Sequence, residues 1–402
     1  MQTVILAGGK AEGLFPFSAT RPTCLIEVGG RPVLSATFYH LRRCGVRQVL
    51  LVVGHKREVL SEHYGRGDQV GLELGYAVQR EVTGIGEALL TARPHVSAQE
   101  PFLLIYGDIR TPANIFAQAL EAFSAFEMPV AVVCLTRGGE RLGNVYMDES
   151  GRITRVIEKP GEPGMGNYVL AGVYVLPPAI FDLIEKSGGK MEEALAELIQ
   201  QVGLRAVIWE EDWVDLEYPW KILEANTVVM DRWRQARIDH SVRFHGNVKV
   251  EGPVRIERDV VVDSGSVIKG PCFIGAGTYI GNNALVRHYT AIGPGAVVGY
   301  GVELKNCVVF SRSMIGRLSF IGDSVVGENV DIGSGTMTVN VDLQERTIQV
   351  PVGGRAMDTG LRKLGAFIGD GARIGASNTL AAGSIIAPGA IVPHHFTCGG
   401  GD

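Results

Sequence analysis

The sequence predicts an α/β domain with a mostly parallel sheet, followed by a parallel β-helix built from six-residue repeats. Two patterns predict this fold class. In the first half of the 402 residues, short apolar runs alternate with amphipathic segments, which is typical of parallel strands joined by helices. From Val250 onward, large apolar residues instead recur at every sixth position. We therefore expect one domain over residues 1–230, a bridging segment over 231–246 and a second domain over 247–402.

The elements of the first domain follow from the alternation. Strands are expected at 3–6, 48–53, 72–78, 102–106, 130–135, 168–175 and 206–209, and helices at 33–44, 55–64, 88–93, 114–125 and 191–202. Residues 144–156 are expected to form a hairpin that turns at 149–151. Pro219 suits the first turn of a helix, which we expect to continue towards Ile238 and to join the two domains.

The second domain follows from a strict spacing of six. The apolar residues on this spacing are Val250, Ile256, Val262, Ile268, Ile274, Ile280, Val286, Ile292, Val298, Leu304 and Phe310. Each hexad of such a repeat supplies one short strand and a turn, and three hexads complete a triangular coil. The rhythm stutters over 314–327 and is interrupted by a long loop over 338–365. It returns at Ile368.

The composition limits which partners and which cellular compartment we expect for this protein. A formal net charge of −5 and a pI of about 6.0 give no basic field for nucleic acid or an anionic membrane. The six cysteines are scattered without a C-x-x-C pair, which is typical of reduced thiols. The apolar run 49–53 is far too short to span a bilayer. We expect a cytoplasmic protein without nucleic-acid or membrane partners.

The first strand ends in Gly8-Gly9, at the edge where open α/β sheets bind ligands. Backbone N–H groups of glycines can approach a phosphate closely, although a Gly-Gly pair is also an ordinary tight turn. The longer segment 6–26 resembles the signature loop of the sugar-1-phosphate nucleotidyltransferases, L-A-G-G-x-G-T-R-L-x-P…R-P-K-P-L-I. The residues in register are Leu6, Ala7, Gly8, Gly9, Leu14, Pro16, Arg21, Pro22, Leu25 and Ile26. The resemblance implies a Rossmann-like domain that binds a nucleotide at Leu6, Ala7, Gly8 and Gly9.

The same loop lacks two positively charged residues of the family pattern. Gly13 stands where the family has arginine, Thr23 stands where it has lysine, and Glu12 adds a negative charge. In the family these cations neutralise the triphosphate and the sugar phosphate as pyrophosphate leaves. Lys10, Arg21 and Lys159 are the cations that remain available. Restoring Gly13→Arg together with Thr23→Lys is expected to raise turnover if the loop binds phosphates.

The resemblance also assigns the metal, the base and the sugar. Asp108 and Asp215 match the two Mg²⁺ carboxylates, although an isolated aspartate is often only a helix cap or a surface charge. The resemblance implies that Gln79 and Gly84 contact a pyrimidine base, with Ile85 in place of the family's threonine. It further implies that Gly143 and Glu158 bind the sugar and that Lys159 meets the sugar phosphate as a catalytic cation. Leu170 replaces the asparagine that contacts an N-acetyl group.

In the second domain, residues 310–323 and 329–340 resemble the acetyltransferase half of the bifunctional enzymes that make UDP-N-acetylglucosamine, in the shorter archaeal layout. Arg317 stands where that family has its general-base histidine, and a guanidinium cannot accept the proton. Lys305 and Asn340 match family positions, and Ser377 would flank a coenzyme A groove. The resemblance implies a left-handed coil, a homotrimer, and acetyl-CoA only if this half is active. We expect it to be inactive.

Two hypotheses of function follow. The first is a nucleotidyltransferase that joins a nucleoside triphosphate to a sugar 1-phosphate with Mg²⁺, with weakened or altered activity. The alternative is a non-catalytic relative that binds a sugar nucleotide and regulates a partner. A third hypothesis, an acyltransferase alone, is disfavoured by Arg317.

Overall fold

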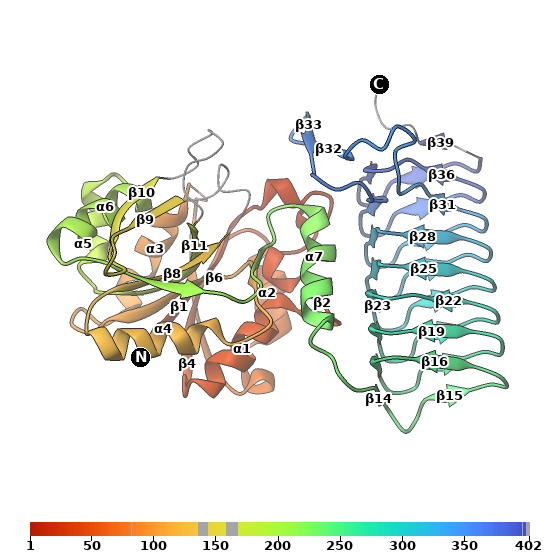
Figure 1. Cartoon of the computed structure of the whole chain (residues 1–402), viewed down its shortest axis with the longest axis horizontal. Helices are drawn as coiled ribbons and strands as arrows, with labels where there is room; N and C mark the ends of the chain where they lie inside the picture. The colour runs from red at the N-terminus through yellow and green to blue at the C-terminus, as the bar shows by residue number, and fades with distance from the viewer. Residues whose placement is uncertain (82, 136–143, 158–167, 396, 399–402) are drawn as a thin grey trace. The chain divides into compact units, whose positions relative to one another are not determined.

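The computed structural model describes residues 1–81, 83–135, 144–157, 168–395 and 397–398, which form two compact units (Figure 1). The α/β unit comprises Met1–Lys10, Pro22–Leu25 and Val33–Asp215. The coil unit comprises Ala11–Arg21, Ile26–Pro32 and Leu216–Asp402. Two short segments near the N-terminus therefore belong to the same unit as the second half of the chain. A single domain boundary in the sequence cannot describe this division.

The α/β unit contains a nine-stranded sheet. Its strands are β1 (Thr3–Ala7), β4 (Gln48–Val53), β5 (Glu73–Val78), β6 (Phe102–Tyr106), β8 (Val130–Leu135), β9 (Asn144–Met147), β10 (Ile153–Ile157), β11 (Tyr168–Leu176) and β12 (Arg205–Trp209). The main order is β10-β9-β11-β6-β1-β4-β5, with β8 beside β11 and β12 beside β8. β6, β1, β4 and β5 run parallel, whereas β11 is antiparallel to β6. The α/β prediction is confirmed, as is the hairpin of β9 and β10.

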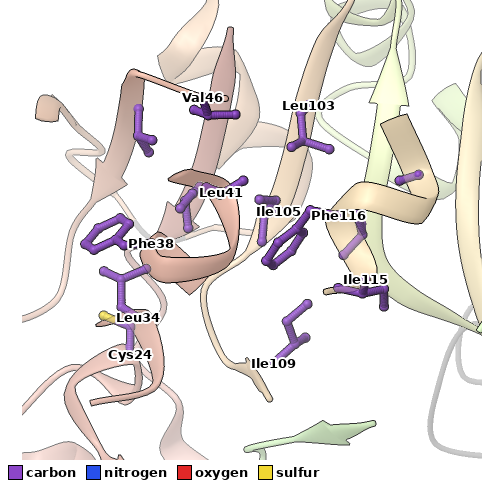
Figure 2. Close-up of a cluster of buried hydrophobic side chains, with 14 of the residues drawn as sticks. Cys24, Leu34, Phe38, Leu41, Val46, Leu103, Ile105, Ile109, Ile115 and Phe116 are labelled. Atoms are coloured by element: carbon purple, nitrogen blue, oxygen red, sulfur yellow. The ribbon is translucent and has the colours of Figure 1, made fainter. Parts of the chain in front are cut away.

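Helices cover both faces of this sheet because successive strand residues point to opposite sides. Ile5 faces a core shared with α1 (Val33–Arg43), α2 (Arg57–Tyr64) and α4 (Ile115–Phe126), and Figure 2 shows Ile105 of β6 beside Phe116 of α4 in that core. Val4 faces a second core with α3 (Ile85–Ala92), α5 (Ile180–Lys186) and α6 (Met191–Gln201). The sequence pattern did not reveal α5, a helix of only seven residues.

The coil unit stacks short strands into three parallel sheets of eight strands each (Figure 1). The first contains β14 (Arg237–Ile238), β17 (Val254–Ile256), β20 (Cys272–Ile274), β23 (Thr290–Ile292), β26 (Val308–Val309), β29 (Val325–Val326), β34 (Phe367–Ile368) and β37 (Ile385–Ile386). The second contains β15 (Arg243–Phe244), β18 (Val261–Val262), β21 (Tyr279–Ile280), β24 (Val297–Val298), β27 (Met314–Ile315), β30 (Asp331–Ile332), β35 (Arg373–Ile374) and β38 (Ile391–Val392). The third contains β16 (Lys249–Glu251), β19 (Val267–Lys269), β22 (Leu285–Val286), β25 (Glu303–Lys305), β28 (Phe320–Gly322), β31 (Met337–Thr338), β36 (Thr379–Leu380) and β39 (Thr397–Cys398). This arrangement is the one expected of a parallel β-helix.

The hexad pattern is confirmed for ten of its eleven positions and wrong at the last. Ile274 pairs with Ile292 in the first sheet, eighteen residues apart, but Ile292 pairs with Val309, only seventeen residues on. The shorter coil moves the inward position from Phe310 to Val309, which lies in the core of the coil. The ring of Phe310 instead packs edge-on against Phe17, with ring centroids 5.7 Å apart.

The bridge between the two halves is shorter than predicted. α7 (Pro219–Met230) begins at the expected proline but ends at Met230, so the prediction of a helix towards Ile238 is wrong. Residues Arg237–Ile238 already form β14, and Arg243–Phe244 form β15, so the coil starts within the segment expected to be a linker. The predicted long loop carries a hairpin of β32 (Gln349–Val352) and β33 (Arg355–Asp358).

Candidate active site

Four parallel strands of the α/β unit end at one edge of the sheet, and the turn after β1 is packed there against the turn after β4. A Cβ on Gly8 would lie 2.9 Å from the backbone nitrogen of Gly54, so no larger residue fits. The carbonyl of Gly8 accepts a hydrogen bond from the His55 backbone nitrogen at 3.0 Å. A Cβ on Gly9 would meet nothing within 4 Å. The turn is therefore tightly packed at Gly8 and has free space at Gly9.

Gln79 directly follows β5 and lies over this turn. Its backbone nitrogen donates to the Val53 carbonyl at 2.8 Å, and its side-chain Oε1 would lie 3.3 Å from a Cβ on Gly8. The side chain is only 7% exposed, and its Nε2 is buried without a hydrogen-bond partner among the described residues. Because an unpaired buried amide donor costs stability, this atom indicates a place for an acceptor from outside the chain.

Gly84 precedes α3 with φ of +148° and ψ of 176°, a conformation that favours glycine. A Cβ there would meet nothing within 4 Å, so the glycine is required by the backbone rather than by a close neighbour. Ile85, which stands where the nucleotidyltransferase pattern has threonine, begins α3 and is 39% exposed.

The two predicted metal ligands belong to segments that are joined by a short antiparallel pair of strands. Asp108 lies in the turn after β6, and the preceding Gly107 nitrogen donates to the Leu6 carbonyl of β1 at 2.9 Å. The next residues form β7 (Ile109–Arg110), which pairs antiparallel with β13 (Val214–Asp215) so that Asp215 lies opposite Ile109. Opposed residues of an antiparallel pair are about 5 Å apart at Cα, so the backbone of Asp215 lies close to Ile109, the residue after Asp108.

The charge of Asp108 is also felt by a neighbouring thiol. Burial raises the pKa of Cys24 to about 12, and the charge on Asp108 adds to the increase. No group of three or more His, Cys, Asp or Glu side chains is placed to hold a metal ion in the described ranges. Two carboxylates suit Mg²⁺, which usually keeps waters and substrate phosphates as its other ligands.

The segment that carries Leu170 lies next to these aspartates. The Ala171 carbonyl accepts a hydrogen bond from Trp213 Nε1 at 3.1 Å. Gly172 has φ of +75°, and a Cβ there would lie 2.9 Å from the ring of Tyr106, two residues before Asp108. The other three sugar-side residues predicted from the sequence, Gly143, Glu158 and Lys159, lie outside the described residues.

The segment that follows the glycine turn belongs to the coil unit. Ala11 adopts the left-handed conformation, with φ of +47°, at the position where the family pattern has glycine. A Cβ on Gly13 would lie 2.8 Å from the carbonyl oxygen of Glu217 and 3.2 Å from the Tyr218 ring. An arginine at position 13 would force this backbone to move, so the expected rescue by Gly13→Arg is incompatible with the packing.

Arg21 is not available to bind a phosphate, and that expectation is wrong. Its Nη2 lies 2.5 Å from Asp370 Oδ2 and 3.0 Å from Glu328 Oε2, and its side chain is only 12% exposed. The guanidinium also lies 4.8 Å from the centre of the Phe310 ring. Lys10, in contrast, is exposed. The repeat of the coil places Glu328 beside Asp370 in successive coils. The long loop between the two positions hides this relationship in the sequence.

In the coil, Lys305 and Asn340 are brought together by Asp323. This carboxylate accepts hydrogen bonds from Asn306 Nδ2 at 2.7 Å and from Asn340 Nδ2 at 2.6 Å. Lys305 Nζ lies 3.4 Å from the same carboxylate, which is buried. Sequence reasoning missed Asn306, although its separation of seventeen residues from Asp323 is one short coil.

Ser377 lies on a different corner of the coil. Its nitrogen donates to the Ser334 carbonyl at 2.8 Å, between the second and third sheets. Arg317 occupies the same corner, where its carbonyl accepts from the Gly335 nitrogen at 2.9 Å. Asp323 instead follows β28, between the third sheet and the first. The structure therefore does not bring Ser377 to Lys305 and Asn340 within one chain.

Comparisons with known proteins find relatives over most of the chain. Residues 2–232 match a family model described as nucleotidyl transferase, and residues 268–350 match one described as GMPPB C-terminal domain. The bifunctional protein GlmU of Methanocaldococcus jannaschii is 34% identical over 93% of this chain and 89% of its own length. A bifunctional sugar-1-phosphate nucleotidylyltransferase/acetyltransferase of Sulfurisphaera tokodaii is 31% identical over 98% of this chain and 97% of its own.

A solved structure has the same fold as the α/β unit. It is a Bacillus anthracis protein described as a glucose-1-phosphate thymidylyltransferase in complex with sucrose, and it is 22% identical to this chain. The match covers 57% of this chain and 95% of that one, with a TM-score of 0.52.

Proposed function

Because this chain belongs to the nucleotidyl transferase family and is GlmU-like, we propose that it joins a pyrimidine nucleoside triphosphate to a sugar 1-phosphate. An oxygen of the sugar phosphate forms a bond to the α-phosphorus, the α–β anhydride bond breaks, and pyrophosphate leaves. The observation that carries the proposal is the buried, unpartnered Nε2 of Gln79 beside the glycine turn.

Gln79 suits a pyrimidine for a chemical reason. Uracil and thymine present a carbonyl acceptor next to an N–H donor, and a glutamine amide offers the complementary donor and acceptor. A base held there would satisfy Nε2, which has no acceptor among the described residues. The backbone N–H groups at the open Gly9 would then lie near the phosphates of the same nucleotide.

Asp108 and Asp215 would hold Mg²⁺ in this scheme. When bound, the ion supplies positive charge and a template for phosphoryl transfer. The chain's own contribution is to fix the two carboxylates through the β7–β13 pair and to keep Ala171 and Gly172 against Trp213 and Tyr106. Lys159 would neutralise the sugar phosphate, with Gly143 and Glu158 at the sugar.

A second candidate function is a non-catalytic sugar-nucleotide-binding regulator. The observation that favours it is the loss of cations, because Arg21 is engaged by Asp370 and Gly13 is packed against Glu217. Fewer cations on the leaving pyrophosphate would leave binding possible and slow the chemical step. We propose the enzyme with weakened or altered activity, since the residues that would bind the nucleotide and the metal ion, Gln79, Asp108 and Asp215, are present in the sequence.

For the coil unit we propose a left-handed, trimeric β-helix without acetyltransferase activity. Three residues on the outer side of the second sheet support assembly with copies of the chain. Val297 and Met314 are apolar and 37% and 45% exposed, and the aromatic Tyr279 beside them is 39% exposed. Arg317 at the expected base supports inactivity. We also propose a cytoplasmic location because Cys24, Cys44, Cys134, Cys272 and Cys307 are free thiols. No described helix is long and apolar enough to cross a membrane.

The test is pyrophosphate release with a panel of nucleoside triphosphates and sugar 1-phosphates, beside calorimetric binding of the same ligands. Turnover above that of Asp108→Asn supports the enzyme. Tight binding without turnover supports the regulator. Neither binding nor turnover with any member of the panel overturns both.

A further inference from the structure

A groove of about 480 Å³ lies entirely within the coil unit, at the end where the coil begins (β14 in Figure 1). Its charged lining consists of Arg31, Arg237, Arg255, Arg258, Asp239 and Glu257. The four arginines exceed the two carboxylates, in a protein whose formal net charge is −5. None of these residues belongs to the α/β unit that carries Gln79 and Asp108.

Two of the arginines are forced together by the register of the first sheet. Arg237 of β14 pairs with Arg255 of β17, and Arg255 pairs with Phe273 of β20. Farther along the same row, Phe273, Val308 and Phe367 are buried, so the row changes from apolar to doubly cationic at the first two coils. Like charges on adjacent strands repel and destabilise the pair. The third cation, Arg31, lies in β3 (Arg31–Pro32), just before α1.

Arg255 is held in place without a counter-charge. Its guanidinium stacks on the Trp233 ring at 3.9 Å, and its Nε is buried with no hydrogen-bond partner in the described part of the chain. Burial lowers the pKa of Arg255, and the charges of Arg237 and Arg31 lower it further. The three guanidinium groups therefore act on one another across the groove.

The two carboxylates of the groove accept hydrogen bonds from neutral groups and, within the described residues, form no ion pair with the groove arginines. Asp239 Oδ1 accepts from the Ser241 nitrogen at 2.9 Å and from the Ser241 hydroxyl at 2.7 Å. Glu257 Oε2 accepts from the Ala276 nitrogen at 3.2 Å. Among the described residues, no carboxylate lies within 4.0 Å of any of the four groove arginines. With four arginines and two carboxylates, the groove lining carries an excess of positive charge that an anion from solution would offset.

We propose that this groove binds a small phosphate-bearing anion, held by Arg31, Arg237 and Arg255. Guanidinium forks match phosphate oxygens in pairs, and a doubly charged phosphate offsets the repulsion along the Arg237–Arg255 row. The volume suits a ligand larger than a single ion. Orthophosphate, pyrophosphate and a sugar 1-phosphate share this chemistry. A bound anion would hold the segment 26–32, which contributes Arg31, against the first two coils.

The experiment measures binding of each of these three anions by calorimetry and by the shift in melting temperature, at constant ionic strength and with EDTA to remove divalent metal. Wild-type protein is expected to bind at least one of them, and to melt several degrees higher at saturation. Arg237→Gln and Arg255→Gln should weaken the binding at least tenfold. The matched control is Arg243→Gln, an exposed arginine of the same first coil outside the groove, which should bind like wild type.

Comparing the three ligands shows whether the groove prefers orthophosphate, pyrophosphate or a sugar 1-phosphate. Binding of any one of them that depends on these arginines supports the proposal. Arg255→Gln removes the stack on Trp233 and can therefore affect folding. Arg237 is exposed, so Arg237→Gln is expected to fold like wild type and keeps the test decisive. Absence of binding by all three anions at about 10 mM overturns the proposal. Binding that is equally strong in Arg237→Gln and wild type also overturns it, because the anion then lies elsewhere.

Discussion

Arg21 Nη2 lies 2.5 Å from Asp370 Oδ2, across 349 residues of sequence. Thr20 reinforces the contact, since its hydroxyl donates to the same carboxylate oxygen at 2.6 Å. The segment Ala11–Arg21 follows the glycine turn of the α/β unit yet packs with the coil. The cation that the signature loop seemed to offer to a phosphate is therefore a structural cation of the coil unit.

Removing Arg21 should destabilise the coil unit. Arg21→Gln removes the cation of Asp370, while Glu328 keeps its ion pair with Arg312, and we expect a loss of about 2–4 kcal/mol. Urea unfolding checks this value, and a double-mutant cycle with Asp370→Asn should give a coupling energy above about 1 kcal/mol. A coupling energy near zero would show that the ion pair is not formed in solution.

Glu27 should make stability depend on pH. It lies in β2 (Glu27–Val28), where burial raises the pKa of its carboxyl; the Arg21 charge partly offsets this effect, and Glu328 and Glu257 add to it. A raised pKa contributes stability that is complete below the unfolded value of about 4.5 and is lost as the pH rises through the folded pKa. Ionised Glu27 therefore costs stability at neutral pH.

Glu27→Gln should accordingly be more stable than wild type at pH 7, with the advantage disappearing near pH 4. Urea midpoints measured across this range check the trend. Glu149→Gln, at an exposed turn, is the control and should track wild type at every pH. An advantage for Glu27→Gln that is the same at pH 4 and pH 7 would contradict this assignment.

Asp323 should matter for stability rather than for acyl transfer. In Asp323→Asn the carboxylate that binds Lys305, Asn306 and Asn340 is replaced by an amide, and we expect a loss of about 2–3 kcal/mol. Asp331→Asn, at an exposed position of β30, is the control and should stay within about 0.5 kcal/mol of wild type. Thiol release from acetyl-CoA with an amino-sugar phosphate should stay at background in all three proteins; acetyl transfer by wild type would contradict the account.

The two aspartates of the candidate active site should act together. Asp108→Asn and Asp215→Asn are each expected to lower Mg²⁺-dependent pyrophosphate release at least a hundredfold. Asp212→Asn is the matched control, because Asp212 lies three residues from Asp215 and is exposed. Direct titration of Mg²⁺ should show weaker binding in the first two variants only. Equal activity in Asp212→Asn and Asp215→Asn would remove Asp215 from the metal site.

The parts of the fold that obey a simple period could be predicted from sequence. Alternation placed β1, β4 and β6, and the hexads placed the coil, because burial on one face imposes a fixed spacing. The prediction failed at Phe310, where a coil loses one residue and the spacing resets. It also failed for Arg21, since a motif carries no information about a carboxylate 349 residues away.

The candidate site was predictable where its residues follow strands. Gly8, Gln79 and Asp108 each come just after a strand of the parallel sheet, so they converge at one edge. The packing of Gly13 against Glu217 could not be read from the sequence because it joins two segments of the coil unit that are far apart in the chain. For the groove arginines, the sequence offered one signal: Arg237 and Arg255 are separated by eighteen residues, which is the length of one coil, and they therefore pair on adjacent strands.

The role of Gln79 is tested most directly by pyrophosphate release with each of the four common ribonucleoside triphosphates and dTTP, in wild type and Gln79→Glu. The account predicts turnover with UTP or dTTP above ATP and GTP, and a loss of at least tenfold in kcat/KM for that pyrimidine in the variant, because the buried donor Nε2 is removed. Gln99→Glu, at an exposed site, should match wild type. Equal kcat/KM for the preferred nucleotide in wild type and Gln79→Glu would contradict the account.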